Sequence, residues 1–442
     1  MTRNWSSRRF LRKLMACKSC CILPDASSHY PSYRFRWVFC QLEMLRLCFR
    51  SGVRQLVNEL PDTLDETYER VLKEIPKTNR GHVRRLLQCL AVAMRPLRVQ
   101  ELAQVLTLGF HAVQGEFSMV DADSRPEDQE QEILSACPSL ITIVGNNRSR
   151  VVQFSHFSVK EFLMSGRLST STEDISHYHI PFDAAHTTIA QASLGVLLRL
   201  DDRFHRQPWN IPLAEYAAEH WVSHVQVASA SSRIMRMMET LFDLDKPHFA
   251  AWVRIYDMDE RSWNPNANPA KPLYYASFGG LYDLVEHLLK KYPEHVNALG
   301  GQHDYPLVAA LHKGHTRVAD LLLQHGANVE GRGTNGRTPL HQSIRHFNDT
   351  VFSAVPFLLE HGADANAQQS DLRTPLHLAA ALGNDKVAQI LLQHIVHVDQ
   401  GVLDSFCSSP GQYSTIPILF NCYWGMARVY TRRTCMTVPR CT

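Results

Sequence analysis

The sequence lacks the signatures of several common functional classes. Its 442 residues contain no uninterrupted apolar run of eighteen, so we expect no transmembrane helix. No Gly-Lys-Ser or Gly-Lys-Thr triplet occurs, so the phosphate-cradling P-loop is missing. The GxSxG nucleophile elbow and the HExxH zinc motif are missing as well. These absences favour a binding protein over an enzyme.

Cysteine is scarce in the body of the chain. Of the 11 cysteines, only Cys89 and Cys137 lie between Phe49 and Phe406. An odd number with this distribution indicates reduced thiols and a cytoplasmic protein rather than a disulfide framework. The CKSCC sequence at Cys17–Cys21 is a lone CxxC without a distant partner pair, which is a weak zinc signal. We therefore predict no metal and no cofactor.

The net charge of +3 hides an uneven distribution. Residues 1–54 hold eleven Lys and Arg against two acids, and residues 400–442 hold four against one. Of the 46 basic and 43 acidic residues, 31 and 40 therefore remain for residues 55–399, a net charge of −9. An acidic body does not attract phosphate backbones, which argues against general nucleic-acid binding.

The tetrapeptide TPLH occurs twice, beginning at Thr338 and at Thr374. Two weaker copies precede it, and the four prolines are spaced by 34, 33 and 36 residues, at Pro272, Pro306, Pro339 and Pro375. The longer third repeat, around RHFNDTVFSA, predicts a lengthened turn between its two helices. A period near 33 with TPLH is typical of ankyrin repeats, and residues 271–399 closely resemble that family.

Local chemistry explains why each copy forms a helical hairpin. Thr374 can cap a helix N-terminus, and Pro375 suits the first helical position because its missing N–H costs nothing there. Leu376 begins an apolar face, and Gly383 is suited to a left-handed stop. One hairpin cannot bury its own apolar face, so we expect a stacked array of about four repeats.

The middle of the chain carries a second pattern. Thr63 and Glu66 form a capping-box signature before a helix, a second helix is expected over His82–Met94, and VQELAQVL predicts a third after a turn at RPLR. Two β-rich runs around GNN, in SLITIVGNNRSRVVQF, predict a hairpin, and FSHFSVKEFLMSG predicts a following helix. Three helices followed by a hairpin is the order of a winged-helix domain.

Several phrases over residues 35–394 resemble fungal NACHT-ankyrin proteins of the STAND/NLR-like type, among them FRWVFCQLEMLRLC, LPDTLDETYERVLKEI, FSHFSVKEFL and NIPLAEYAAEHWVSHVQ. The resemblance implies a winged helix of the GPI inositol-deacylase type between a NACHT module and the repeats. Because no P-loop occurs, the sequence is expected to lack the NACHT nucleotide-binding core, and the family's ATPase activity is not carried over.

The expected fold class is mainly α: a winged-helix domain with a small β-hairpin, a helical connector and an ankyrin-repeat solenoid. The predicted organisation is an unstructured or remnant N-terminus (1–34), the trailing end of a NACHT-type module (35–58), the winged helix (59–166), the connector (167–265), the repeats (266–399) and an aberrant or disordered tail (400–442).

The predicted function is non-catalytic protein binding, as a fragment of a NACHT-type signalling or self-recognition receptor. A partner is expected on the concave face and finger loops of the repeats, where a rigid scaffold presents side chains on turns. The candidate partner-binding residues are Arg332, Asn335, Arg337, Asp371 and Arg373.

Two alternatives remain open. A winged helix can bind DNA, with Arg148, Arg150 and Lys160 as contacts, or the chain can be a regulatory fragment of an NTP-dependent switch. His156, His341 and His377 have no accompanying ligand or catalytic motif, and the two TPLH histidines are better explained as hydrogen-bonding groups that tie one repeat to the next.

Overall fold

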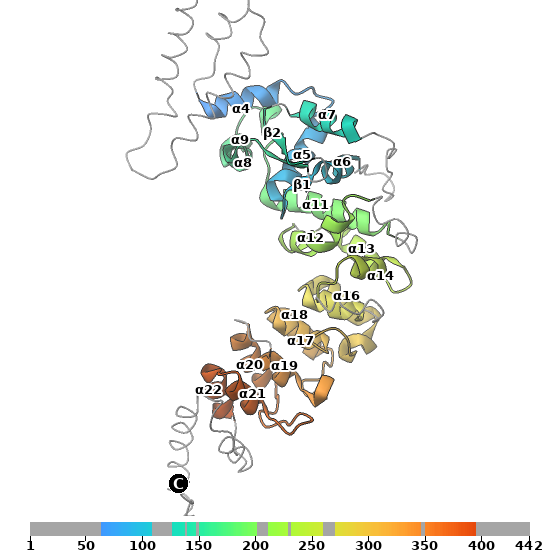
Figure 1. Cartoon of the computed structure of the whole chain (residues 1–442), viewed down its shortest axis with the longest axis vertical. Coiled ribbons are helices and arrows are strands. Elements are labelled where there is room, and N and C mark those ends of the chain that lie inside the picture. Colours follow the sequence, from blue (N-terminus) through green and yellow to red (C-terminus); the bar gives the residue numbers. More distant parts are fainter. Residues whose placement is uncertain are drawn as a thin grey trace, which may run out of the picture. The chain divides into compact units, whose positions relative to one another are not determined.

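The computed structural model describes residues 63–107, 126–137, 139–146, 150–200, 211–228, 231–259, 270–345 and 350–394. The chain divides after Met237 into two compact units, and helices dominate both (Figure 1). Predicted features within residues 1–62 and 395–442, including the NACHT remnant and the tail, lie outside the described residues.

The first unit contains a small sheet among helices. Its elements are α4 (Leu64–Lys73), α5 (Arg80–Val92), β1 (Leu97–Arg98), α6 (Val99–Thr107), α7 (Pro126–Ala136), β2 (Ile141–Val144), β3 (Val151–Phe154), α8 (Phe157–Met164), α9 (Gly166–Ser169), α10 (Glu173–Ser176), α11 (Phe182–Leu197) and α12 (Ala214–Val227). The next helix, α13 (Ser232–Leu241), crosses the division between the units.

The capping box predicted at Thr63 is present. The Glu66 backbone N–H donates to Thr63 Oγ1 at 3.1 Å, and the Thr63 N–H donates to the Glu66 carboxylate at 3.4 Å. Helix α4 then buries Leu64, Tyr68 and Leu72 on one face, as the spacing of its apolar residues predicts. The Tyr68 and Ser158 hydroxyls are 2.8 Å apart, which ties this face to α8.

The winged-helix prediction is confirmed with two corrections. The predicted hairpin forms, with Ile141 opposite Phe154 and Val144 opposite Val151. The RPLR segment is not only a turn, because Leu97–Arg98 is a short strand that pairs antiparallel with β3 and makes a three-stranded sheet, β1-β3-β2. A fourth helix, α7, also precedes the hairpin and was not predicted.

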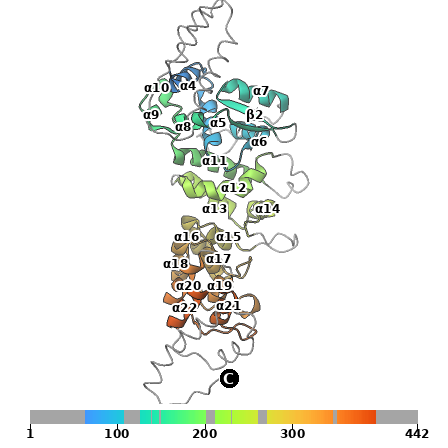
Figure 2. The same ribbon diagram turned by 60° about the vertical axis from the view of Figure 1, so that its left-hand side comes forward.

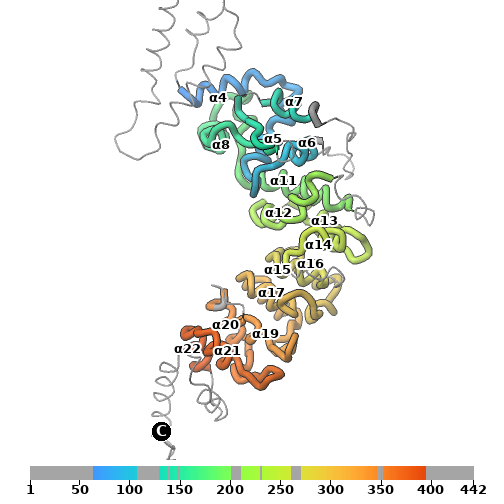
Figure 3. Tube along the Cα trace, in the orientation of Figure 1, coloured from blue at the N-terminus to red at the C-terminus, as the bar shows by residue number. Residues whose placement is uncertain are grey.

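Two long helices, α11 and α12, pack side by side in the region predicted as a helical connector (Figure 3). Both helices carry fully buried apolar side chains, among them Ile189, Leu194, Ala217 and Trp221, and the buried His186–His224 contact joins the two helices. Helix α11 also packs on α5 of the winged helix. These buried faces join the winged helix and the two following helices into one core.

The second unit is a stack of helical hairpins. After α14 (His248–Ile255), the pairs are α15 (Pro272–Phe278) with α16 (Tyr282–Lys291), α17 (Pro306–His312) with α18 (Thr316–Gln324), α19 (Pro339–Arg345) with α20 (Val351–Glu360), and α21 (Pro375–Ala381) with α22 (Asp385–His394). Two 3₁₀ turns, η4 (Pro293–Asn297) and η5 (Thr334–Gly336), lie between pairs. Figure 2 shows the first helices of the pairs in one column and the second helices in another.

The four hairpins agree with the predicted repeats in detail. A proline begins the first helix of each pair, and Gly383 has the expected left-handed φ of 68° after α21. Gly362, after α20, has a φ of 87°. Five residues separate α19 from α20 whereas three separate α17 from α18, so the turn of the third repeat is longer, as predicted.

Candidate protein-binding surface

The second, third and fourth repeats each begin with a tight backbone turn, and we call residues 300–304, 333–337 and 369–373 the finger turns. In each, the first residue's N–H donates to the last residue's carbonyl, at 2.8 Å from Gly300, 2.8 Å from Gly333 and 3.0 Å from Gln369. The same bond recurs because the sequence repeats with the ankyrin period. The finger turns therefore present side chains from equivalent backbone positions.

The TPLH histidines link the helices to these turns. Thr338 Oγ1 and His341 Nδ1 are 2.8 Å apart, and His341 Nε2 lies 3.1 Å from the carbonyl oxygen of Arg373 in the next finger turn. The Thr374 hydroxyl and His377 Nδ1 make the same 2.8 Å contact in the fourth repeat. Burial lowers the pKa of both histidines. His341 thus bridges two repeats as a neutral group, as predicted.

A buried carboxylate joins the second and third repeats. Asp304, at the end of the first finger turn, is 4% exposed and accepts hydrogen bonds from the Thr334 N–H at 2.9 Å and from the Thr334 hydroxyl at 2.5 Å. It also accepts a bond from the Gln342 amide. These donors compensate for the loss of water around the buried carboxylate. Asp304 therefore fixes one finger turn against the next.

Two of the five predicted binding residues connect adjacent finger turns. Arg332 Nη1 donates to the Gln368 carbonyl at 2.6 Å, and Arg337 Nε donates to Gln369 Oε1 at 3.1 Å. Both guanidinium groups therefore bind neutral acceptors of the fourth repeat. This contact gives Arg332 and Arg337 a structural role in addition to any role in partner binding.

The other three predicted residues lie at the tips of the turns. Asn335 has a left-handed φ of 61°, and its carbonyl accepts the Ser370 N–H at 3.0 Å. Arg373 and Asp371 form an ion pair at 3.5 Å, with 59% and 54% of their side chains exposed. The pair itself contributes little to stability. Asp371 Oδ1 also accepts the Gln369 side-chain amide at 2.7 Å and the Arg373 N–H at 3.2 Å, so Asp371 supports the turn while both side chains remain exposed to a partner.

One exposed residue of this surface was missed by the sequence prediction. Leu372, between Asp371 and Arg373, is 70% exposed and has a φ of +67°. Comparing TNGRTPLH with SDLRTPLH would have found it, because Leu372 occupies the position of Gly336 in the preceding repeat.

The surroundings of the candidate DNA contacts in the winged helix are unfavourable for binding phosphate groups. Helix α7, which precedes the wing, reads PEDQEQEILSA, with four acids and no Lys or Arg. Arg150 of the wing forms an ion pair with Glu130 of this helix at 2.5 Å. Lys160 is exposed on α8, and Arg148 lies outside the described residues. An acidic helix beside the wing repels phosphate groups.

His156, the third candidate histidine, caps α8. Its Nδ1 accepts the Ser158 N–H at 3.3 Å and lies 2.6 Å from the Ser158 hydroxyl. Because Ser158 is 4% exposed and its hydroxyl also contacts Tyr68, this pair holds α8 against α4. The geometry indicates a structural role.

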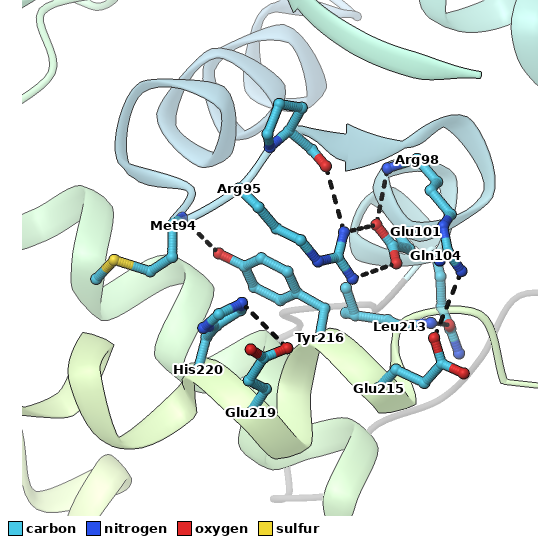
Figure 4. Close-up of polar contacts among 11 residues, drawn as sticks. Met94, Arg95, Arg98, Glu101, Gln104, Leu213, Glu215, Tyr216, Glu219 and His220 are labelled. Atoms are coloured by element: carbon cyan, nitrogen blue, oxygen red, sulfur yellow. Dashed lines mark hydrogen bonds and ion pairs between the residues drawn. The ribbon is translucent and has the colours of Figure 1, made fainter. Parts of the chain in front are cut away.

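A buried ion pair connects the winged helix to α12 (Figure 4). Arg95 donates to both oxygens of Glu101, at 2.8 and 2.7 Å, and Glu101 is 1% exposed. The Arg98 N–H donates to the same carboxylate at 2.7 Å. The Arg95 guanidinium lies 5.0 Å from the ring centroid of Tyr216, which belongs to α12.

Tyr216 continues this network into the core. Its hydroxyl accepts the Met94 N–H at 3.2 Å and lies 2.8 Å from His224 Nε2. His224 Nδ1 is in turn 2.9 Å from Nδ1 of His186 on α11. Burial lowers the pKa of both imidazoles, that of His224 to about 3. The chain of contacts links α5, α11 and α12 through neutral histidines.

Within the described parts of the chain, no helix is long and apolar enough to cross a membrane. The same residues include no group of three or more His, Cys, Asp or Glu side chains arranged to hold a metal ion. Cys89 and Cys137 are buried free thiols whose pKa values burial raises to about 12, so neither is a reactive thiolate.

Comparison with known families agrees with this architecture. Residues 273–369 match "Ankyrin repeats (3 copies)", residues 371–401 match "Ankyrin repeat", and residues 70–173 match "GPI inositol-deacylase, winged helix domain". The protein therefore combines a winged-helix domain of this type with ankyrin repeats, which indicate a role in protein interaction.

One relative is similar over more than half of the chain. The "Azaphilone pigments biosynthesis cluster protein L" of Monascus ruber is 31% identical over an alignment of 300 residues that covers 62% of this chain and 61% of the relative. The chain thus covers about three fifths of the length of that protein.

Proposed function

We propose that this chain is a non-catalytic protein-binding module that holds a partner protein on its ankyrin repeats. The partner contacts the finger turns and the concave face formed by the first helices of the repeats. The module acts in the cytoplasm as part of a fungal signalling or self-recognition system of the NACHT type, which the resemblance of its winged helix and repeats supports.

The observation that carries this proposal is the ladder of finger turns. Backbone bonds close each turn, and the bonds from Arg332 and Arg337 hold the finger turn of the third repeat against that of the fourth repeat. A rigid row of turns loses little conformational entropy when a partner binds, which is the condition for affinity on a loop surface. The exposed tips, Asp371 and Arg373, remain for recognition.

The name of the relative refers to a pigment biosynthesis cluster. The contacts of the candidate histidines support a non-catalytic role, since each stabilises a helix end or a repeat junction.

The DNA-binding alternative is less well supported. The acidic α7 and the Arg150–Glu130 pair place negative charge where a winged helix would approach phosphates. An NTP-dependent switch would require a phosphate-binding loop, and the sequence contains no GK[ST].

The test uses the full chain as bait in a fungal lysate, with mass spectrometry to identify bound proteins. We expect R373A to lose the proteins that the unchanged chain captures, while its melting temperature stays the same because the Arg373 side chain is 59% exposed and its pair with Asp371 lies at the surface. The matched control is R167A, which removes an 86% exposed arginine paired with Asp65 in the first unit. If R373A and R167A retain the same proteins, the finger turns do not bind them.

A further inference from the structure

Leu372 occupies a backbone position that the preceding repeat gives to glycine. Leu372 and Gly336 both have a φ of +67°. In each case the N–H donates to the carbonyl three residues earlier, at 2.9 Å for Leu372 to Gln369 and 3.0 Å for Gly336 to Gly333. The two turns are therefore equivalent, and a leucine stands where the turn requires a left-handed residue.

Neither the backbone nor the core benefits from this leucine. A left-handed conformation brings the Cβ of an L-residue too close to the following carbonyl, so leucine is disfavoured there and glycine is not. The Leu372 side chain is 70% exposed, so it gains little from burial in the repeat itself. A residue that is both strained and exposed points to a role outside the folding of the chain.

The charges around Leu372 indicate what such a residue would meet. Arg332 and Arg337 donate to neutral acceptors and keep their positive charge, whereas Arg373 is paired with Asp371. Residues 332–337 and 369–373 therefore carry three arginines against one acid. The turn that bears Leu372 is itself balanced by Arg373 and Asp371. The surplus comes from Arg332 and Arg337 of the neighbouring segment, which bond to Gln368 and Gln369.

We propose that Leu372 is the apolar anchor of this surface, and that it binds a partner segment in which large apolar side chains are flanked by carboxylates. The inference rests on the proposed function, because it assigns the partner chemistry of the same finger turns. The apolar side chains of the partner cover Leu372, and the carboxylates lie near Arg332 and Arg337. A few residues that fill a pocket of the partner carry most of the binding energy of an interface, and the contacts around them exclude water.

The substitution L372G separates this role from a structural one. Glycine removes the apolar side chain and also relieves the left-handed strain, so binding weakens while the fold becomes more stable. We expect the unfolding equilibrium constant of the repeats to fall by roughly threefold to tenfold. The matched control is L299G, since Leu299 is 62% exposed, lies just before the first finger turn and does not have a positive φ.

The probe is a phage-displayed library of random dodecapeptides selected on the immobilised full chain. We expect enriched peptides that combine large apolar residues with Asp or Glu, that bind L372G at least tenfold more weakly than the unchanged chain, and that bind L299G equally well. Denaturant unfolding of the second unit, followed by hydrogen exchange in α19 to α22, measures the stability of the same variants.

Each contrary result has a distinct meaning. Enriched peptides that bind L372G as tightly as the unchanged chain, or peptides rich in Lys and Arg, overturn the anchor assignment and leave the proposed function standing. Selection that enriches no binding peptide overturns both. A loss of stability in L372G shows that the leucine supports the fold and also overturns the anchor assignment.

Discussion

Lowering the pH from 7.5 to 5 is expected to loosen α11 and α12 through the buried pair of His186 and His224. Both rings are almost fully buried, with 2% and 0% exposure. Only one of the two facing Nδ1 atoms can carry a proton in their 2.9 Å contact, so a second proton breaks it. Nearby Lys160 and His220 further disfavour a positive charge on His186 and His224, respectively.

The sign and size follow from the pKa values. Because burial holds the pKa of His224 at about 3, below its unfolded value of about 6.5, the unfolded state binds more protons between these limits. The stabilisation is therefore complete above about pH 6.5 and declines as the pH falls toward 3. Between pH 7.5 and 5, His224 alone accounts for a loss of about 2 kcal/mol, and the lowered pKa of His186 adds to it.

The assay is hydrogen exchange of the α11 and α12 amides in the full chain, with rates corrected for the intrinsic effect of pH. The comparison is the double variant H186Q/H224Q, which keeps polar side chains at both positions but cannot bind protons there. The double variant is expected to be less stable at pH 7.5 and to lose much less protection on acidification. His177 and His220, whose pKa values are also lowered by burial, remain in both proteins and serve as an internal control.

Equal loss of protection in the two proteins would refute the assignment of acid sensitivity to this pair. A larger loss in the double variant would contradict the sign of the linkage.

Three further predictions concern other parts of the chain. Leu376 is 3% exposed in the core of the fourth repeat, so L376A is expected to lower the free energy of unfolding by about 2–5 kcal/mol. Amide hydrogen exchange is expected to increase first in α19 to α22, and a uniform increase along the chain would contradict nearest-neighbour coupling between repeats. E101A removes a carboxylate that is 1% exposed, but Arg95 is 31% exposed and stays hydrated, so the expected cost in urea unfolding is about 1.5–3 kcal/mol. R98A, which removes a pair 50% and 59% exposed, is expected to cost less than about 1 kcal/mol; similar costs would argue against the burial reasoning. Calorimetric titration with ATP or GTP is expected to show no saturable binding in the micromolar range, because the sequence has no GK[ST].

The repeat array was predictable because its signals are local and periodic. Pro339 and Pro375 start helices, Gly362 and Gly383 take left-handed conformations, and each effect acts within a few residues. The wing was predictable for a similar reason, since β-rich runs flank a turn.

Contacts between distant segments were not predictable. Arg95 and Glu101 are six residues apart with a strand between them, and neither the helical nor the strand period predicts that residues at this spacing meet. Tyr216, which contacts Arg95, is more than a hundred residues away in the sequence. The strand at Leu97–Arg98 exists because it pairs with Val151 and Val152, and two residues alone give no strand pattern. The structural contacts of Arg332 and Arg337 were missed because their acceptors lie in the next repeat.

The bond from His341 to the Arg373 carbonyl has a consequence for how this surface changes over generations. Every amino acid at position 373 would supply a backbone carbonyl for His341. The Gln369 N–H closes the turn by donating to the same carbonyl, so this bond does not depend on the side chain at position 373 either. Mutation can therefore replace the exposed side chain at 373 without disturbing the junction between the third and fourth repeats. Substitutions at position 373 can therefore change which partner binds while the framework of the repeats stays constant.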